Sequence, residues 1–148
     1  MGGVRTLWTI GYERLLPPEL VAELEAAGVE RVIDVRYRPQ SRRPGMSKTR
    51  LGDLLGAHGI AYEHRKALGT PPDLRHDFHA GRLEQARAGY RAHVEATAPD
   101  ELQALAAELD AGPRTALLCL EADPAGCHRR VVCEALGERV ADLRVVDL

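Results

Sequence analysis

The chain has 148 residues, of which 45% are apolar and 28% charged, and its formal net charge is −2. This length favours a single domain, residues 1–148, with room for a sizeable core. The near-neutral charge argues against a wholly basic nucleic-acid binder, and no apolar run reaches the roughly 20 residues of a membrane-spanning helix.

Strand-like and helix-like patterns alternate through the first half of the chain. Short β-branched or apolar runs indicate three strands, at residues 6–11, 31–36 and 60–64. Two amphipathic helical patterns lie between them, at residues 17–28 and 47–59. The basic segment 37–47 has neither pattern and is predicted to be a long loop.

The second half opens with segment 66–81, which shows little periodicity and is predicted to be a second long loop. Loops of this length are uncommon in compact domains unless they have a function. Three helices are predicted after it, at residues 82–98, at 99–112 and in a stretch that ends near Gly137. Two strands are predicted as well, a continuously apolar one at 115–120 and a last one at 143–148.

This alternation predicts an α/β fold, a single-domain, three-layer Rossmann-like arrangement. We expect a mostly parallel sheet of about five strands with helices on both faces. In open sheets of this kind, ligands bind outside the carboxyl ends of the strands. Residues that follow the strands are therefore the first place to look for a site.

Unusual polar residues follow four of the predicted strands. They are Tyr12 after the first strand; Asp34, Arg36, Arg38, Ser41 and Arg42 at and after the second; Tyr62 and His64 in the third; and Glu121, Cys127, His128 and Arg129 after the fourth. All of them should lie at one edge of the sheet. This convergence is the main functional signal in the sequence.

Positive charge is concentrated near these residues. Residues 36–50 contain six basic side chains and no acidic one, which leaves a charge of −8 for the remainder. Arg129 stands near a predicted helix start, where backbone amides favour anions and disfavour arginine by a few tenths to about 1 kcal/mol. A bound anion would reverse that cost, so we predict an anion site in which Tyr12, Ser41, Tyr62 and His64 assist Arg36, Arg38, Arg42 and Arg129. Alternatively, the helix begins at Pro124 with Asp123 as its cap, and Arg129 and Arg130 are solvated or paired to Glu134.

Cys127 is a candidate nucleophile. A thiol at a helix start, next to His128 and Arg129, should lose its proton more easily than a free thiol. His128, Glu121 and Asp34 are candidate proton carriers. Alternatively, Cys127 merely fills the turn, because adjacent side chains on a helix point apart. Cys119 and Cys133 fall within apolar runs and are predicted to be core residues.

Motifs for cofactors are missing from the sequence. It contains no phosphatase-type Cys loop with an arginine six positions on, no glycine-rich phosphate loop and no Gly-x-Gly-x-x-Gly, so no cofactor is predicted. His76 and His79 are three apart, with Asp73 and Asp77 nearby, but no second ligand motif accompanies them. A polar loop is the preferred interpretation, and no metal is predicted.

The motifs together resemble an uncharacterised bacterial family, domain of unknown function 488. The resemblance covers residues 6–140 and rests on Thr9-Ile10-Gly11, Asp34-Val35-Arg36 with Pro39 and Ser41, Tyr62 with Leu68-Gly69, Cys119-Leu120-Glu121 and Cys127-His128-Arg129. It implies a compact α/β domain with a shared site, and it implies no particular reaction. The family commonly has His-Ser after Thr-Ile-Gly, where this chain has Tyr12-Glu13.

The leading hypothesis is an enzyme-like domain that binds a small anionic, phosphate-bearing substrate, with Cys127 as nucleophile. A second hypothesis is a non-catalytic module that binds nucleic-acid phosphates through the basic loop 36–50. A third is a purely structural or partner-binding domain, and a homodimer is among the alternatives for its assembly. Three cysteines without disulfide-like spacing, and a start without a secretory signal, predict a reduced, cytoplasmic protein with no membrane partner.

Overall fold

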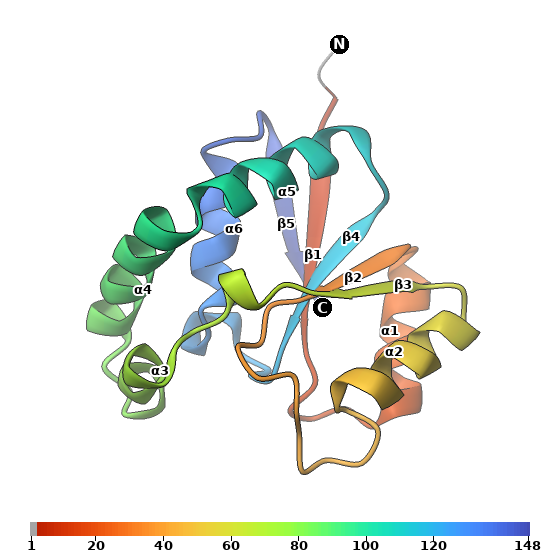
Figure 1. The fold of residues 1–148 in the computed structure, drawn as a ribbon. Coiled ribbons are helices and arrows are strands. Elements are labelled where there is room, and N and C mark those ends of the chain that lie inside the picture. The colour runs from red at the N-terminus through yellow and green to blue at the C-terminus, as the bar shows by residue number, and fades with distance from the viewer. Residues whose placement is uncertain (1–2) are drawn as a thin grey trace.

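Five parallel strands form the central sheet of the protein, whose computed structural model describes residues 3–148 (Figure 1). The strands are β1 (Arg5–Gly11), β2 (Arg31–Asp34), β3 (Ala61–His64), β4 (Thr115–Cys119) and β5 (Leu143–Asp147). Their order in the sheet is β3-β2-β4-β1-β5, and every neighbouring pair is parallel. The predicted α/β class, with its parallel sheet, is therefore confirmed.

Helices cover both faces of this sheet (Figure 1). They are α1 (Pro17–Ala27), α2 (Lys48–Ala57), α3 (Pro72–His79), α4 (Leu83–Thr97), α5 (Pro99–Ala111) and α6 (Arg129–Gly137), with short 3-10 turns η1 (Lys66–Leu68) and η2 (Pro124–Gly126). The apolar residues of α1 and α2 form one buried cluster with the sheet. Those of α4, α5 and α6 form the other, so the domain has three layers.

The apolar sequence of β4 is explained by the position of this strand in the sheet. Successive side chains of a strand point to opposite faces, and here both faces are covered. Leu117 packs in the cluster with α5 and α6, whereas Ala116 and Leu118 pack in the cluster with α1 and α2. All five residues of β4 are buried.

The second strand is shorter than predicted and ends at Asp34. Val35 still donates its backbone N–H to Leu118 O at 3.1 Å. The backbone N–H of Arg36, however, donates to the Asp34 carboxylate at 3.0 Å. A side chain thus replaces the sheet as hydrogen-bond partner, and the chain turns into the irregular loop 37–47.

The prediction that the whole of segment 66–81 is a long loop is wrong. It contains η1 and the eight-residue helix α3, in which Phe78 is the buried residue. A helix this short and this polar leaves too few apolar positions for a periodicity to show. Its start is defined by Pro71 and Pro72, which suit the first turn of a helix.

The strand order brings the ends of β2, β4 and β1 together at the centre of the sheet. The end of β3 lies outside them, next to β2. The polar residues that follow β1, β2 and β4 therefore meet, whereas those of β3 hydrogen-bond to residues at and just after the end of β2. Within residues 3–148, no helix is long and apolar enough to cross a bilayer.

Candidate functional site

A cavity of about 50 Å³ lies at the carboxyl ends of the central strands. Tyr12 follows β1, Arg36 follows β2, and Cys119 ends β4; all three line the cavity. The other lining residues come from loop 37–47 (Tyr37, Arg38, Gln40), from segment 66–81 (Thr70, Arg75, Phe78) and from the chain after β4 (Leu120, Glu121, Cys127, His128). The volume suffices for a few water molecules or for the end group of a ligand.

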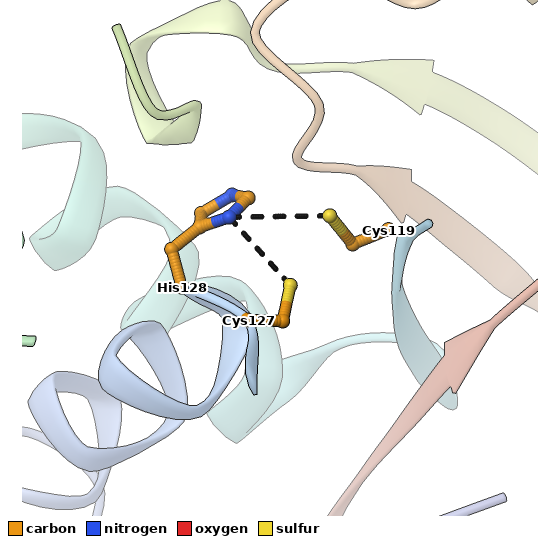
Figure 2. Close-up of side chains that lie close together, drawn as sticks. All are labelled: Cys119, Cys127 and His128. Carbon is orange, nitrogen blue, oxygen red and sulfur yellow. Dashed lines mark hydrogen bonds between the residues drawn. The ribbon is translucent and has the colours of Figure 1, made fainter. Parts of the chain in front are cut away.

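Two cysteines and a histidine form a buried group at this cavity, which we call the Cys–His cluster: Cys119, Cys127 and His128. Figure 2 shows both sulfurs directed at the same ring nitrogen. His128 Nδ1 lies 3.6 Å from Cys127 Sγ and 3.9 Å from Cys119 Sγ. His128 Nε2 lies 2.7 Å from Val35 O. Because a carbonyl only accepts, Nε2 carries a hydrogen, and Nδ1 of the neutral ring is free to accept one from a thiol.

Adjacent residues converge here because Cys127 is not helical. Its φ and ψ are −136° and 149°, an extended conformation. His128 is the residue before α6 and has φ −64° and ψ −18°. This change of conformation between neighbours turns the thiol and the imidazole toward each other, which two helical neighbours do not do.

The surroundings of the cluster influence its protonation. A hydrogen bond with Cys127, together with burial, raises the pKa of Cys119 well above that of an ordinary thiol. Burial opposes the charged form of His128, but Cys119 and the Val35 carbonyl outweigh it, so the pKa of His128 is raised. Cys119 also donates to Glu121 Oε2 at 3.4 Å. Cys119 is therefore held as a thiol, which leaves Cys127 as the candidate nucleophile.

Asp34 and Arg36 neutralise each other at the cavity, which Arg36 lines. Asp34 is fully buried and accepts from the Arg36 guanidinium, with Arg36 Nη2 at 2.7 Å from Asp34 Oδ2. It also accepts from the Tyr62 hydroxyl. Burial opposes the charge of Arg36, but hydrogen bonding and charge attraction to Asp34 outweigh it and raise the pKa of Arg36. Asp34 is not among the cavity-lining residues. The contacts of Asp34 hold Arg36 in place, and its role as a proton carrier stays a prediction.

The guanidinium of Arg36 makes two more hydrogen bonds, and the backbone carbonyl of Arg36 makes a third contact. Its Nη1 donates to Met46 O at 2.7 Å and to the Tyr12 hydroxyl at 3.2 Å. His64 Nε2 lies 2.7 Å from the carbonyl oxygen of Arg36. The predicted anion ligands Tyr12, Tyr62 and His64 thus help to fix Arg36, and of these three only Tyr12 lines the cavity.

Arg129 lies elsewhere than the anion hypothesis requires. Its side chain is fully buried, and its Nη1 donates to Glu121 O at 2.5 Å and its Nη2 to Ala122 O at 3.3 Å. It is not among the cavity-lining residues, because it braces the turn that carries Glu121. Asp123 caps only the short η2, by accepting from the Ala125 N–H, and α6 itself begins at Arg129.

Of the four arginines predicted to bind an anion, Arg38 alone both lines the cavity and has a guanidinium without a partner in the described residues. Arg38 is exposed and has no hydrogen-bond or ion-pair partner within residues 3–148. Arg42 is likewise exposed and unpaired in that range, but it does not line the cavity. Ser41 accepts from the backbone N–H of Arg43 at 3.0 Å and so serves the loop itself.

Sequence reasoning missed several cavity residues, and two of them, Thr70 and Arg75, carry polar groups without a partner among the residues that the structure describes. Arg75 is exposed and forms no ion pair in the described part of the chain. Thr70 is 4% exposed, and its hydroxyl has no hydrogen-bond partner in residues 3–148. The signal was the unusual polar segment 66–81, but nothing local predicted which of its residues would face the site. A second hollow of about 250 Å³ shares Arg38, Thr70 and Arg75 with the cavity and is also lined by His76 and His79.

The fold and the cavity define an α/β domain with a polar, cysteine-containing cavity at the carboxyl edge of a parallel sheet. The chain belongs to the family described as "Domain of unknown function DUF488", whose model matches residues 17–136. The resemblance seen in the sequence is thereby confirmed. Comparison with curated proteins and with solved structures gives no match.

Proposed function

We propose that the protein is an enzyme that binds the anionic, phosphate-bearing end of a small substrate in the cavity and uses Cys127 as nucleophile. The observation that carries the proposal is the Thr70 hydroxyl, buried and unpartnered within residues 3–148, on a cavity that Arg38 and Arg75 also line. A buried hydroxyl without a partner is costly, and a ligand oxygen would satisfy it.

The charge around the cavity supports an anion. Arg36 is neutralised by Asp34, and Arg129 is bonded to backbone carbonyls. Arg38 and Arg75 have no such partner among the described residues, and the guanidinium fork matches phosphate and carboxylate oxygens. The inner cavity accepts only an end group, so the remainder of the substrate would lie in the adjoining hollow with His76 and His79.

The Cys–His cluster supports nucleophilic chemistry on that end group. Cys127 would pass its proton to His128 Nδ1, 3.6 Å away, and the thiolate would attack an electrophilic carbon or phosphorus. As the bond to the leaving group breaks, His128 would return the proton to it. Glu121, which lines the same cavity, would assist the water that then releases the bound group. Free thiols suit a reducing, cytoplasmic setting, and all three cysteines are free.

The test is binding of inorganic phosphate, measured by calorimetry on the wild type and on Arg38→Ala and Arg75→Ala. Each variant should bind about 5- to 10-fold more weakly, because each loses a charge-assisted hydrogen bond worth about 1 kcal/mol at a partly exposed position. Arg144→Ala is the matched control, an exposed arginine on the edge strand β5. Phosphate should also slow alkylation of Cys127. Equal affinities in all four proteins, or an equal loss in the control, would contradict the proposal.

A second candidate is nucleic-acid binding by the basic loop, favoured by Arg42 and Arg50, which are exposed and unpaired in the described chain. Arg43 is unsuitable for testing it, because its guanidinium donates to backbone carbonyls of the 12–15 turn. The variant Arg42→Ala/Arg50→Ala avoids that damage. Single-stranded DNA binding that falls steeply with salt, disappears in this variant and ignores Cys127→Ser would favour the second candidate over the enzyme.

A further inference from the structure

We propose that the Cys–His cluster is a binding site for a soft divalent cation of the zinc type. The Sγ atoms of Cys119 and Cys127 and the Nδ1 of His128 all lie within 4.8 Å of one another. All three residues are buried, so the ligand atoms have little competition from solvent. Thiolate and imidazole are the ligands that zinc prefers in proteins, and a Cys₂His set is one of its known combinations.

The distances between the ligand atoms fit a tetrahedral metal. With Zn–S of about 2.3 Å and Zn–N of about 2.0–2.1 Å, a sulfur and a nitrogen on the same ion are about 3.6 Å apart. Cys127 Sγ lies 3.6 Å from His128 Nδ1, and Cys119 Sγ lies 3.9 Å from it. Figure 2 shows the three atoms facing a common point from two segments of the chain. A metal would therefore need only small side-chain movements.

The imidazole is already oriented for coordination. His128 Nε2 is held by Val35 O at 2.7 Å, which leaves Nδ1 as the free nitrogen. A metal-binding histidine commonly donates its other ring N–H in this way, and the bond fixes both ring orientation and tautomer. The backbone carbonyl of Val35 directly follows β2, so three parts of the fold determine the position of the three ligand atoms.

The fourth coordination position would face the cavity, because all three ligand residues line it. Such an open position is typical of catalytic zinc sites and not of closed structural ones. Glu121 lines the same cavity, with Oε2 3.4 Å from Cys119 Sγ. The site has no local sequence motif, because the two cysteines are eight positions apart and form no Cys-x-x-Cys pair.

This inference goes beyond the proposed anion binding and does not depend on it, since neither Arg38 nor Arg75 is a ligand. It does affect Cys127. Both thiols lose their protons when they coordinate the metal, and the protons pass to the buffer. A metal-bound Cys127 is no longer available as a nucleophile, so the metal-loaded and nucleophilic forms exclude each other.

The test is titration of metal-free, phosphine-reduced protein with Co²⁺, followed by displacement with Zn²⁺. We expect thiolate-to-cobalt charge-transfer absorption and tetrahedral d–d bands that saturate at one ion per chain. Cys119→Ser and Cys127→Ser should each weaken metal binding by at least about 100-fold. Loss of a residue that only hydrogen-bonds to a metal ligand costs roughly 10- to 100-fold in affinity, and loss of the ligand itself should cost more. In the unmutated protein, Zn²⁺ should also protect Cys127 from alkylation, a readout that does not depend on the folding of any variant.

Two controls separate this site from others. Cys133→Ala removes a buried cysteine outside the cluster, and His76→Ala/His79→Ala removes the histidines of α3; both should retain the cobalt spectrum. Absence of charge-transfer absorption, or a spectrum lost in either control as much as in Cys127→Ser, would overturn the metal site. Phosphate binding by the metal-free protein is measured separately, so failure of the metal site leaves the proposed function to stand or fall on its own.

Discussion

At the scale of single residues, Thr70 is a position where a substitution should change ligand binding without lowering the stability of the protein. Its hydroxyl is buried without a partner within residues 3–148, so it contributes nothing to the free protein that a methyl group would not. Thr9 is also fully buried, but its hydroxyl donates to Asp147 Oδ1 at 2.5 Å. The same substitution at the two positions should therefore have opposite effects.

We predict that Thr70→Val leaves the free energy of unfolding unchanged or slightly higher, and weakens phosphate binding several-fold. Thr9→Val should lower the free energy of unfolding by about 0.5–1.5 kcal/mol, because it removes the hydrogen bond to the Asp147 carboxylate, and leave phosphate binding unchanged. Urea denaturation and calorimetry on both variants measure the two quantities. A Thr70→Val protein as unstable as Thr9→Val would show that the Thr70 hydroxyl has a structural role and no ligand.

Asp34 and Arg36 illustrate how burial changes the function of a charged residue. In the sequence they look like a proton carrier and an anion ligand. In the structure each is the other's partner, with 0% and 5% of the side chain exposed. Leaving one of two buried charges unpaired is strongly destabilising, so their first role is to hold the end of β2 against loop 37–47.

At the scale of elements, the close approach of η1 and loop 37–47 shapes the cavity. Gly69 makes that approach possible, because a Cβ on it would lie 2.4 Å from the Cα of Tyr37. The backbone of Tyr37 cannot yield without moving Arg38, and Gly69 itself precedes Thr70. One glycine thus sets the distance between the two segments that supply the unpaired cavity groups.

We predict that Gly69→Ala lowers the melting temperature and weakens phosphate binding, because the two segments must separate. Gly56→Ala is the matched control: it lies in α2, and a Cβ there meets nothing within 4 Å. That control should raise stability by roughly 0.5–1 kcal/mol through the better helix propensity of alanine. Thermal denaturation followed by circular dichroism tests both, and a Gly69→Ala protein with wild-type stability and binding would refute the account of the close approach.

At the scale of the whole molecule, an ion-pair network joins α5 to two strands. Glu108 accepts from Arg31 and from Arg65, each at 2.6 Å. Hydrogen bonding to Arg65, and then to Arg31, lowers the pKa of Glu108 despite partial burial. A carboxyl whose pKa is lowered by folding stabilises the folded state above its ordinary pKa, and this contribution is lost as pH falls through the lowered value.

We predict that Glu108→Gln lowers the free energy of unfolding at pH 7 and that the difference from wild type disappears in acid, as pH falls below the ordinary glutamate value of 4.5. Because 34% of the Glu108 side chain is exposed, solvent screening limits the effect to about 1 kcal/mol. Glu23→Gln, at an exposed position of α1 with no ion pair within residues 3–148, is the control and should change little at any pH. Urea denaturation across this pH range is the measurement. A difference that persists unchanged in acid would show that the charge of Glu108 is not its cause.

The sequence by itself determined the class of fold and the edge of the sheet at which the cavity lies. The periodicity of a strand or helix depends only on residues that are close in the sequence. The carboxyl ends of parallel strands lie at the same edge of the sheet whatever the order of the strands. Tyr12, Arg36 and Cys127 could therefore be assigned to one region from the sequence. The helix in segment 66–81 could not, because so short and polar a helix has no local signal.

Only the tertiary structure decided which of those groups are free to act. Whether a charge is available depends on which distant segments meet it. Arg36 is ion-paired with Asp34, and Arg129 donates hydrogen bonds to backbone carbonyls after β4. Arg38 and Arg75 line the cavity and have no ion-pair partner among residues 3–148. Cys119, a core residue by its sequence, joins Cys127 and His128 for the same reason: the end of β4 and the start of α6 are adjacent in space and not in the chain.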